Sequence, residues 1–308
     1  MNCKGLFRRC ILMIEVRGIG HSFGPKVVLK DINVTLNNGT IVGLVGVNGA
    51  GKSTFLRILA GVYQPESGSV FYDGGSPSSA STRQNIFFLP DDPYYTHSSS
   101  AKDIFNLYKN FYPKINHDLF LKYLSTYNIE EKKPLRNFSK GMRRQVFIAL
   151  ALAIRPKYLL MDEAFDGLDP LSRKTFKDAI VQYVEQDEGT VIVSSHSLRE
   201  LEDFCDSFIL IDETRVKHHG SIDEHTSRLC KFEMAFADPP NEATFRDLPV
   251  VFLSINGRFV KIALAADAKE MQERLSALNP LIMEEREVDF EEAFIYDVQR
   301  GGVGSNEK

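Results

Sequence analysis

The sequence has no tryptophan and little cysteine. Its four cysteines among 308 residues, Cys3, Cys10, Cys205 and Cys230, lie far apart. A zinc site needs short paired spacings and a disulfide scaffold needs a high cysteine density, so neither fits this distribution. We therefore expect reduced thiols in a reducing compartment.

An excess of basic charge and a long apolar run are also missing. The formal net charge is -4, whereas nucleic-acid-binding domains usually carry a basic face, so no nucleic acid is expected as a partner. The longest apolar stretch, 146–161, is interrupted by Arg155, Pro156 and Lys157. Because a membrane-spanning helix needs about 20 apolar residues, the chain is not expected to cross a membrane.

The N-terminus has basic residues before a short apolar run, which is the order found in signal peptides. Glu15 and Arg17 cut this run too short for that role. We therefore expect residues 1–12 to be a leader outside the fold, with Met13 as an alternative start.

Between Met13 and about Ile222, short apolar runs alternate with amphipathic stretches. This alternation is typical of an α/β domain with a largely parallel sheet. Compact and almost wholly apolar runs indicate strands buried on both faces. Such strands are predicted at 41–45, 158–162, 190–195 and 208–212.

Helix start signals fall between these strands. A helix over 53–60 is predicted directly after a glycine-rich loop. Asp169 is a good N-cap for a helix that begins at Pro170. Ser197 followed by Glu200 three residues later predicts a capping box and another helix.

Two regions depart from this alternation. Residues 103–153 show helical periodicity, which predicts a helical subdomain over about 92–153 inside a larger domain spanning 13–224. After this domain, the pattern predicts strands at 231–236 and 250–264, the second folded back at the Asn256-Gly257 turn. With helices at 268–277 and 290–299, residues 225–308 are predicted to form a small C-terminal α+β domain.

Residues 46–53 read GVNGAGKS, between an apolar run and a helix. Glycines in such a loop let successive N–H groups point at phosphate oxygens, and the helix adds its dipole. Lys52 would neutralise the β- and γ-phosphates of ATP, and Ser53 would coordinate Mg²⁺. A chance glycine turn is the alternative, which the flanking strand and helix disfavour. The predicted nucleotide-binding residues here are Gly46, Asn48, Gly49, Ala50, Gly51, Lys52, Ser53 and Thr54.

Two carboxylates, Asp162 and Glu163, end the apolar run that starts at Tyr158. A strand tip can hold carboxylates because it opens onto the crevice where open α/β sheets bind ligands. We expect Asp162 to hold Mg²⁺ through its water, and Glu163 to orient and polarise the attacking water. Taken alone, such a pair usually caps the next helix; after a phosphate-binding loop the catalytic interpretation is stronger.

The order of these motifs resembles that of the ATP-binding cassette (ABC) ATPases over about residues 14–222. This resemblance implies a P-loop NTPase (RecA-like) core of the α/β class with antiparallel β and helical subdomains, and it implies ATP hydrolysis. The motifs that carry it are the loop 46–53, Ser139-Lys140-Gly141, Asp162-Glu163, Asp166-Gly167-Leu168-Asp169 and Ser195-His196.

The resemblance also assigns roles. In ABC ATPases the loop that contains Ser139 and Gly141 binds the γ-phosphate of ATP held by a partner subunit, although Ser139 alone would indicate only a helix N-cap. Asp169 matches the loop that crosses the dimer interface, and His196 the switch histidine that contacts the γ-phosphate. Phe23 stands where the family stacks an aromatic ring on adenine, with a core phenylalanine as the alternative. The expected assembly is a homodimer or heterodimer of ATPase subunits.

The sequence departs from the family pattern at several positions. The usual Leu-Ser-Gly-Gly-Gln signature is changed at Phe138, Lys140 and Met142, and Asp166 replaces a small or polar residue. Asp91 stands where the family has a glutamine that senses Mg²⁺. Because an acid can bind the metal, Asp91 is predicted as a metal ligand together with Ser53 and Asp162.

The resemblance implies a cytoplasmic subunit, peripheral on the inner face of the cell membrane, that drives a separate transmembrane permease. Four segments are similar in sequence to the ATPases of bacterial drug, antibiotic-peptide and lipid-type exporters. They are residues 139–142, 89–92, 112–113 and 288–294. An importer ATPase and a non-transport ABC ATPase are alternatives. A P-loop kinase or a switch GTPase would not need Ser139 or His196.

Overall fold

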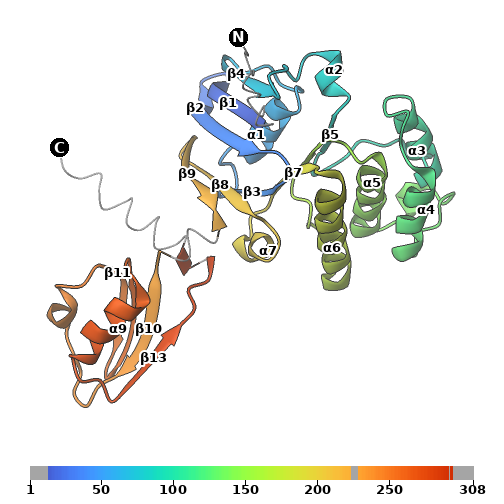
Figure 1. Ribbon diagram of the computed structural model, residues 1–308. Helices are drawn as coiled ribbons and strands as arrows, with labels where there is room; N and C mark the ends of the chain where they lie inside the picture. Colours follow the sequence, from blue (N-terminus) through green and yellow to red (C-terminus); the bar gives the residue numbers. More distant parts are fainter. Residues whose placement is uncertain (1–12, 223–227, 291, 294–308) are drawn as a thin grey trace, which may run out of the picture. The chain divides into compact units, whose positions relative to one another are not determined.

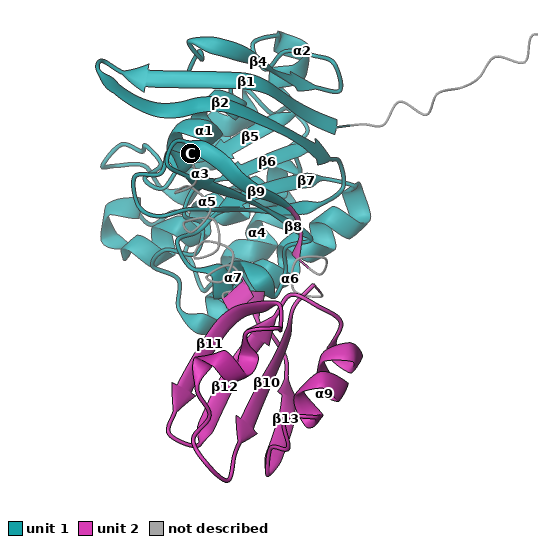
Figure 2. Ribbon diagram, turned by 90° about the vertical axis from the view of Figure 1, so that its left-hand side faces the viewer, with its two compact units in different colours: residues 1–219 teal, residues 220–308 magenta. Residues whose placement is uncertain are grey.

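The computed structural model describes residues 13–222, 228–290 and 292–293. The chain divides into two compact units, Met1–His219 and Gly220–Lys308, which Figure 2 distinguishes by colour. Each unit has its own hydrophobic core. The predicted leader and nearly all of the helix predicted over 290–299 lie outside the described residues.

The first unit begins with an antiparallel sheet. Its strands β1 (Met13–Phe23), β2 (Lys26–Asn37) and β4 (Ser67–Tyr72) lie in the order β2-β1-β4. Inward-facing residues of β2 alternate with exposed ones toward its end, as expected for a sheet with one face on a core. This sheet is the antiparallel subdomain implied by the family resemblance.

A six-stranded sheet follows in the order β5-β6-β7-β3-β8-β9. Its strands are β3 (Ile41–Val45), β5 (Ile86–Leu89), β6 (Tyr158–Met161), β7 (Thr190–Ser194), β8 (Ser207–Asp212) and β9 (Arg215–Ser221). The pairs β5–β6, β6–β7, β7–β3 and β3–β8 are parallel. All four strands predicted for this sheet form, and their carboxyl ends meet at one edge, where ligands bind in open α/β sheets.

Two of these strands are one residue shorter than predicted. β6 and β7 end at Met161 and Ser194 because Asp162 and Ser195 stand at the carboxyl tips, beyond the last paired residues. The polar residues at this edge are therefore available to a ligand instead of being part of the sheet.

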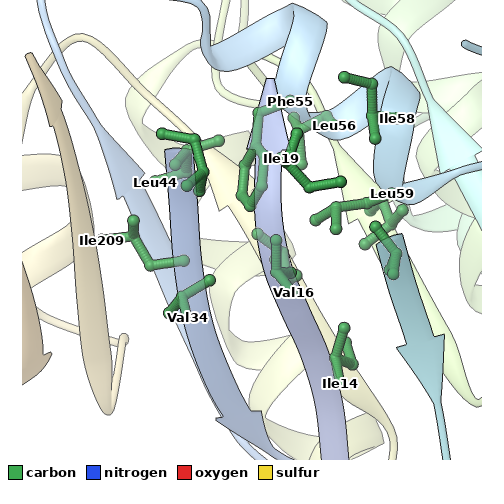
Figure 3. Close-up of a cluster of buried hydrophobic side chains, with 14 of the residues drawn as sticks. Ile14, Val16, Ile19, Val34, Leu44, Phe55, Leu56, Ile58, Leu59 and Ile209 are labelled. Carbon is green, nitrogen blue, oxygen red and sulfur yellow. The ribbon is translucent and has the colours of Figure 1, made fainter. Parts of the chain in front are cut away.

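Helix α1 (Lys52–Leu59) follows the glycine-rich loop and lies between the two sheets. Four apolar side chains on α1 are almost fully buried, and full burial of each contributes about 1.5–3 kcal/mol. This core fixes the first turn of α1 relative to the end of β3. Figure 3 shows Phe55, Leu56, Ile58 and Leu59 packed with Ile14, Val16, Ile19, Val34, Leu44 and Ile209.

Helices α2 (Ala80–Arg83), α6 (Pro170–Asp187) and α7 (Leu198–Glu202) complete the α/β core. As predicted, Asp169 caps α6: its Oδ1 accepts hydrogen bonds from the N–H groups of Leu171 at 3.0 Å and Ser172 at 3.1 Å. The capping of this helix holds the preceding loop, 166–169, in place.

The capping box predicted at the start of α7 is wrong. Ser197 occupies the N-cap position, but its side chain makes no capping bond. Its N–H instead donates to Ser195 Oγ at 3.0 Å, and the Glu200 carboxylate accepts the Ser195 hydroxyl at 2.6 Å. Arg173 also pairs with Glu200. These stronger partners draw Glu200 away from the N-cap backbone.

Residues 101–154, all of them described, contain helices α3 (Ala101–Lys109), α4 (His117–Thr126) and α5 (Lys140–Ile154) and a 3-10 helix, η1 (Leu135–Asn137). Figure 1 shows α3, α4 and α5 gathered on the side of the first unit away from β1 and β2. Helix α5 is buried from Arg144 to its end, which is the pattern of a helix enclosed on all sides.

The second unit is a four-stranded antiparallel sheet in the order β11-β12-β10-β13. It contains β10 (Cys230–Ala235), η2 (Glu242–Phe245), β11 (Val250–Asn256), β12 (Phe259–Leu264), α9 (Ala268–Ser276) and β13 (Ile282–Arg286). The predicted hairpin is present, and Gly257 has φ 61°, which glycine adopts without strain. The strand β13 and the helix η2 were not predicted.

Candidate active site

The loop between β3 and α1 is shaped for close approach of a ligand to its backbone. At Gly46 an added Cβ would lie 2.4 Å from the carbonyl oxygen of Ile211. At Gly51, where φ is 105°, it would lie 2.9 Å from Leu29 Cδ2. Gly51 is also the N-cap of α1 and offers no side-chain cap. The first N–H groups of α1 are thus left for an anion.

The remaining residues of this loop lie where the P-loop interpretation needs them. Asn48 and Gly49 are exposed at the tip, and Ala50 is buried beneath it. Gly49 has φ 84°, a conformation that favours glycine. Ser53, partly buried, and Thr54, buried, lie in the first turn of α1.

The ammonium group of Lys52 lies across the mouth of this loop. Its side chain is almost fully buried, and Nζ donates to the carbonyl oxygen of Gly46 at 2.7 Å. Nζ also lies 3.6 Å from Oε1 of Glu163. Nζ is also 3.5 Å from the carbonyl oxygen of Val47, so the cation is held at the P-loop backbone, where a phosphate would meet it.

Asp162 has one satisfied and one unsatisfied carboxylate oxygen. The residue is 1% exposed, and its Oδ1 accepts the Ser194 hydroxyl at 2.8 Å. Among the described residues, its buried Oδ2 has no hydrogen-bond partner. Leaving such an oxygen unpaired is costly, and a hydrated Mg²⁺ would provide the missing partner. The residues at the tip of β6 therefore fit a magnesium ion.

Glu163 is held in an uncommon backbone conformation directly after Asp162. Its φ is 47°, in the left-handed region that costs a non-glycine residue energy and is often found at functional sites. Its N–H donates to Ser194 Oγ at 2.9 Å, and its Oε2 lies 3.1 Å from Nδ1 of His196. The structure thus brings the predicted general base and the predicted switch histidine into direct contact.

The pKa of His196 is raised from its ordinary value of 6.5, first by its hydrogen bond with Glu163 and then by the charges of Glu163, Asp166 and Glu200, against a lowering effect of burial. One carboxylate oxygen of Glu163, one of Asp166 and one ring nitrogen of His196 all lie within 4.8 Å of one another. His196 itself is 55% exposed. His196 is thus surrounded by carboxylates that favour its charged form.

The predicted signature residues lie at the start of α5. Ser139 is its exposed N-cap, and Oγ accepts the N–H of Met142 at 3.1 Å. At Gly141 an added Cβ would lie 2.2 Å from the carbonyl oxygen of Gly167. Glycine is required there because the two loops touch through their backbones. Lys140 adds an ion pair, with Nζ 3.5 Å from Oδ2 of Asp166.

The structure does not bring every predicted site residue into one place within the chain. Among the described residues, the Ser139 hydroxyl has no hydrogen bond with the P-loop; its recorded partner is Met142. Asp169 is exposed and bonded to the first turn of α6, with its pKa lowered chiefly by the Ser172 hydroxyl. The hydrogen bonds of these two residues within the described part of the chain are local, and none of them joins Lys52, Glu163 or His196.

Sequence reasoning missed Arg144, which binds Asp91. The residue is 2% exposed, and its guanidinium Nη2 donates to Asp91 Oδ1 at 2.8 Å. The Asp91 carboxylate also lies 3.9 Å from Lys140 Nζ. A metal at Asp91 would have to compete with these cations, so its role as a ligand stays a prediction. The signal that could have revealed Arg144 is an arginine at the head of the apolar run 146–154.

Residues 29–166 match the ABC transporter family. The ABC transporter ATP-binding protein YdbJ of Bacillus subtilis is 32% identical over 219 residues, covering 68% of this chain and 70% of the relative. The chain belongs to the ABC transporter family. YtrB, another ABC transporter ATP-binding protein of B. subtilis, is 29% identical to this ABC subunit over 285 residues, covering 92% of the chain and 97% of the relative.

Solved structures resemble this ABC subunit as well. An ATP-binding subunit of an ABC transporter has a TM-score of 0.63 at 26% identity, covering 69% of this chain and 91% of that one. The cbiO1 protein of Clostridium perfringens, part of the ABC transporter complex cbiONQ, has a TM-score of 0.58 at 26% identity, covering 69% and 90%. The chain is thus an ATP-binding subunit and an ATPase, with the predicted P-loop NTPase fold.

Phe23 lies at the end of β1 with nearly half of its side-chain surface open. The residue is 49% exposed, and its ring meets those of His21 and Tyr63 edge-on, with centroids 5.0 and 5.9 Å apart. Phe23 is therefore not a core phenylalanine, and its stacking on adenine stays a prediction.

Among the helices of the described residues, none is both long and apolar enough to cross a membrane.

Proposed function

We propose that this ABC ATPase works as a head-to-tail dimer, in which Ser139 of one subunit completes the site formed by the P-loop of the other. The observation that carries this proposal is the split of the site within the chain. Lys52 of the P-loop lies 3.6 Å from Glu163, which contacts His196, whereas Ser139 lies exposed at the N-terminus of a separate helix. A helix N-terminus favours an anion, and in the proposed dimer that anion is the γ-phosphate held by the partner subunit.

Each side chain then has a role that follows from its position. Lys52 neutralises the phosphates as charge develops on them, and the backbone amides of the P-loop hold their orientation. Ser53 and the free oxygen of Asp162 would hold Mg²⁺, which offsets negative charge on the phosphates. Glu163 takes the proton of the attacking water, and His196 holds the Glu163 carboxylate in place.

We further infer that the subunit lies on the inner face of the cell membrane and drives a separate permease in the direction of export. The signature SKGM and the loop LPDD favour this direction. The lantibiotic transport ATP-binding protein SrtF of Streptococcus pyogenes, 29% identical over 66% of this chain and 89% of the relative, supports it. Import remains a second candidate, since the sulfate/thiosulfate import protein CysA of Synechococcus elongatus is also 29% identical, over 74% of this chain and 68% of that one.

Complementation between two inactive variants tests the shared site. Lys52→Ala removes the phosphate cation, and Ser139→Arg blocks the signature loop. In a mixed dimer both defects fall on one site, and the other site keeps an intact Lys52 and an intact Ser139. We expect mixed preparations to hydrolyse ATP when neither variant does so alone. If each chain had a complete site, mixing would restore nothing.

A further inference from the structure

Arg144 contacts parts of the molecule that lie far apart in the sequence. It is almost fully buried at the start of α5, and its guanidinium makes a hydrogen bond to each of three acceptors. Its Nη1 donates to the carbonyl oxygen of Pro90 at 2.8 Å. Its Nη2 donates to Oδ1 of Asp91 at 2.8 Å and to the carbonyl oxygen of Glu163 at 3.0 Å.

These acceptors belong to different motifs. Pro90 and Asp91 form the loop after β5, and Glu163 follows β6. Arg144 itself lies one turn after the signature residues on α5. The planar fork of an arginine can serve several acceptors at once, which the single ammonium of a lysine cannot do in the same geometry. One side chain therefore fixes the loop, the strand tip and the helix relative to one another.

Glu163 depends on such support because its backbone is in the left-handed region. Its N–H is bonded to Ser194 on one side and its carbonyl oxygen to Arg144 on the other. A carbonyl oxygen held from a rigid helix limits the rotation of the peptide that aims the Glu163 carboxylate. Small errors in that aim matter, because a misplacement of about 1 Å can reduce a rate about 100-fold.

We propose that Arg144 and Asp91 form a positioning pair for Glu163, in which Asp91 acts through Arg144 and not as a metal ligand. The inference deepens the proposed function and rests on the role of Glu163 as the base. Asp91 supplies the carboxylate that orients the guanidinium, and the guanidinium fixes the Glu163 backbone. A change in the loop at Asp91 thus reaches the catalytic carboxylate through a single side chain.

The geometry favours this use of Asp91 over a metal site. Its recorded charged partners are Arg144 at 2.8 Å and Lys140 at 3.9 Å, both cations. The unpaired buried oxygen that suits Mg²⁺ belongs to Asp162, whose partner is the neutral Ser194. Asp91 is thus paired directly with cations, whereas Asp162 has one neutral partner and one oxygen left for a metal.

The test compares Asp91→Asn, Arg144→Lys and the double variant in the full-length chain. Steady-state ATP hydrolysis gives kcat, the KM for ATP and the Mg²⁺ concentration at half-maximal rate. Equilibrium binding of ATP and thermal melting show that each variant is folded. The matched control is a second aspartate–arginine ion pair, which joins Arg155 at the C-cap of α5 to Asp187 at the end of α6, changed to Asp187→Asn and Arg155→Lys.

We expect each single variant at the proposed pair to lower kcat about 10- to 100-fold. The Mg²⁺ concentration at half-maximal rate and the affinity for ATP should stay within about 2-fold of the wild-type values. The kcat of the double variant should be no lower than that of the slower single variant, because the effects of residues that act as a unit are not additive. The control pair should keep the wild-type kcat. Should Arg144→Lys fail to fold, the half-exposed Asp91→Asn variant still decides between the two roles of Asp91.

A rise in the Mg²⁺ requirement with Asp91→Asn, but not with Arg144→Lys, would make Asp91 a metal ligand and overturn the proposal. Unchanged kcat in both variants, or losses that simply multiply in the double variant, would overturn it as well. Failure of the proposed function looks different: hydrolysis would persist when Glu163 itself is replaced by glutamine, whatever the result at Arg144.

Discussion

At the scale of single residues, Glu163 is fixed at each of its polar groups. Its N–H is bonded to Ser194, its carbonyl oxygen to Arg144, and its carboxylate oxygens lie next to Lys52 and His196. In its proposed role as the base, a carboxylate held in this way cannot reorient freely, and it would be aimed before ATP arrives. Preorganisation of this kind lowers the barrier without a cost at the moment of reaction.

Glu163→Gln tests the base at this scale. The amide keeps the size of the side chain but cannot accept the proton of water, so turnover should fall at least about 100-fold while ATP binding is retained. Gel filtration with ATP and Mg²⁺ should then show a persistent dimer, because nucleotide is bound and not consumed. Turnover at the wild-type rate would show that Glu163 is not the base.

The raised pKa of His196 has a pH consequence. Because the folded-state pKa lies above the ordinary 6.5, the attraction between the imidazolium and Glu163 stabilises the protein fully below pH 6.5 and is lost as the pH rises through the folded-state value. An NMR titration of His196 should show this raised pKa, and Glu163→Gln should move it back toward 6.5. A pKa that does not respond would mean that another group raises it.

At the scale of elements, α5 is joined to the loop 166–169 through backbone contact at Gly141. A methyl group there would lie 2.2 Å from the carbonyl oxygen of Gly167, so the two segments must separate to admit it. Lys140 strengthens the same junction through its ion pair with Asp166. The signature residues and the loop that bears Asp169 are thereby held together.

Gly141→Ala should therefore destabilise the protein in spite of alanine's better helix propensity. We expect a net loss of about 1–2 kcal/mol in the free energy of unfolding, measured by urea denaturation. Gly220→Ala is the control, because an added Cβ there meets nothing within 4 Å and the residue has no positive φ. Equal stability of the Gly141 variant would mean that the loop yields freely.

The sequence predicted those elements whose signals are local. Buried apolar runs identified β3, β6, β7 and β8, and Asp169 with Pro170 identified the start of α6. The capping box at Ser197 failed because Ser195 and Arg173, which pack beside Glu200 in space, compete for its carboxylate. The Asp91–Arg144 pair joins positions 53 residues apart, and no local pattern indicates such a contact. The order of the motifs indicated the family, and the roles of the motif residues stay predictions, whereas the contacts among those residues could not be predicted from the sequence.

At the scale of the whole molecule, the chain is two compact units with separate cores, and the ATP site described here lies within the first. A ligand that binds only the folded first unit stabilises that unit by mass action, by about 2.7 kcal/mol at a concentration 100 times its Kd. The second unit has its own core, so we expect its stability to be unaffected by that ligand.

Calorimetry of the full chain should therefore show two unfolding transitions. Non-hydrolysable ATP analogue with Mg²⁺ should raise the transition temperature of one and leave the other in place. Lys52→Ala, which loses the phosphate cation, should abolish the shift without removing either transition. A single transition that moves as a whole would show that the two units unfold together.

The backbone contact between Gly141 and Gly167 also limits the movement of the two segments relative to each other. Where two segments meet through long side chains, a small displacement of one is absorbed by a change of rotamer in the other. At Gly141 the two backbones meet directly, and the Lys140–Asp166 ion pair lies beside this contact. We therefore expect a displacement of the loop that bears Asp169 to move the first turn of α5 with it.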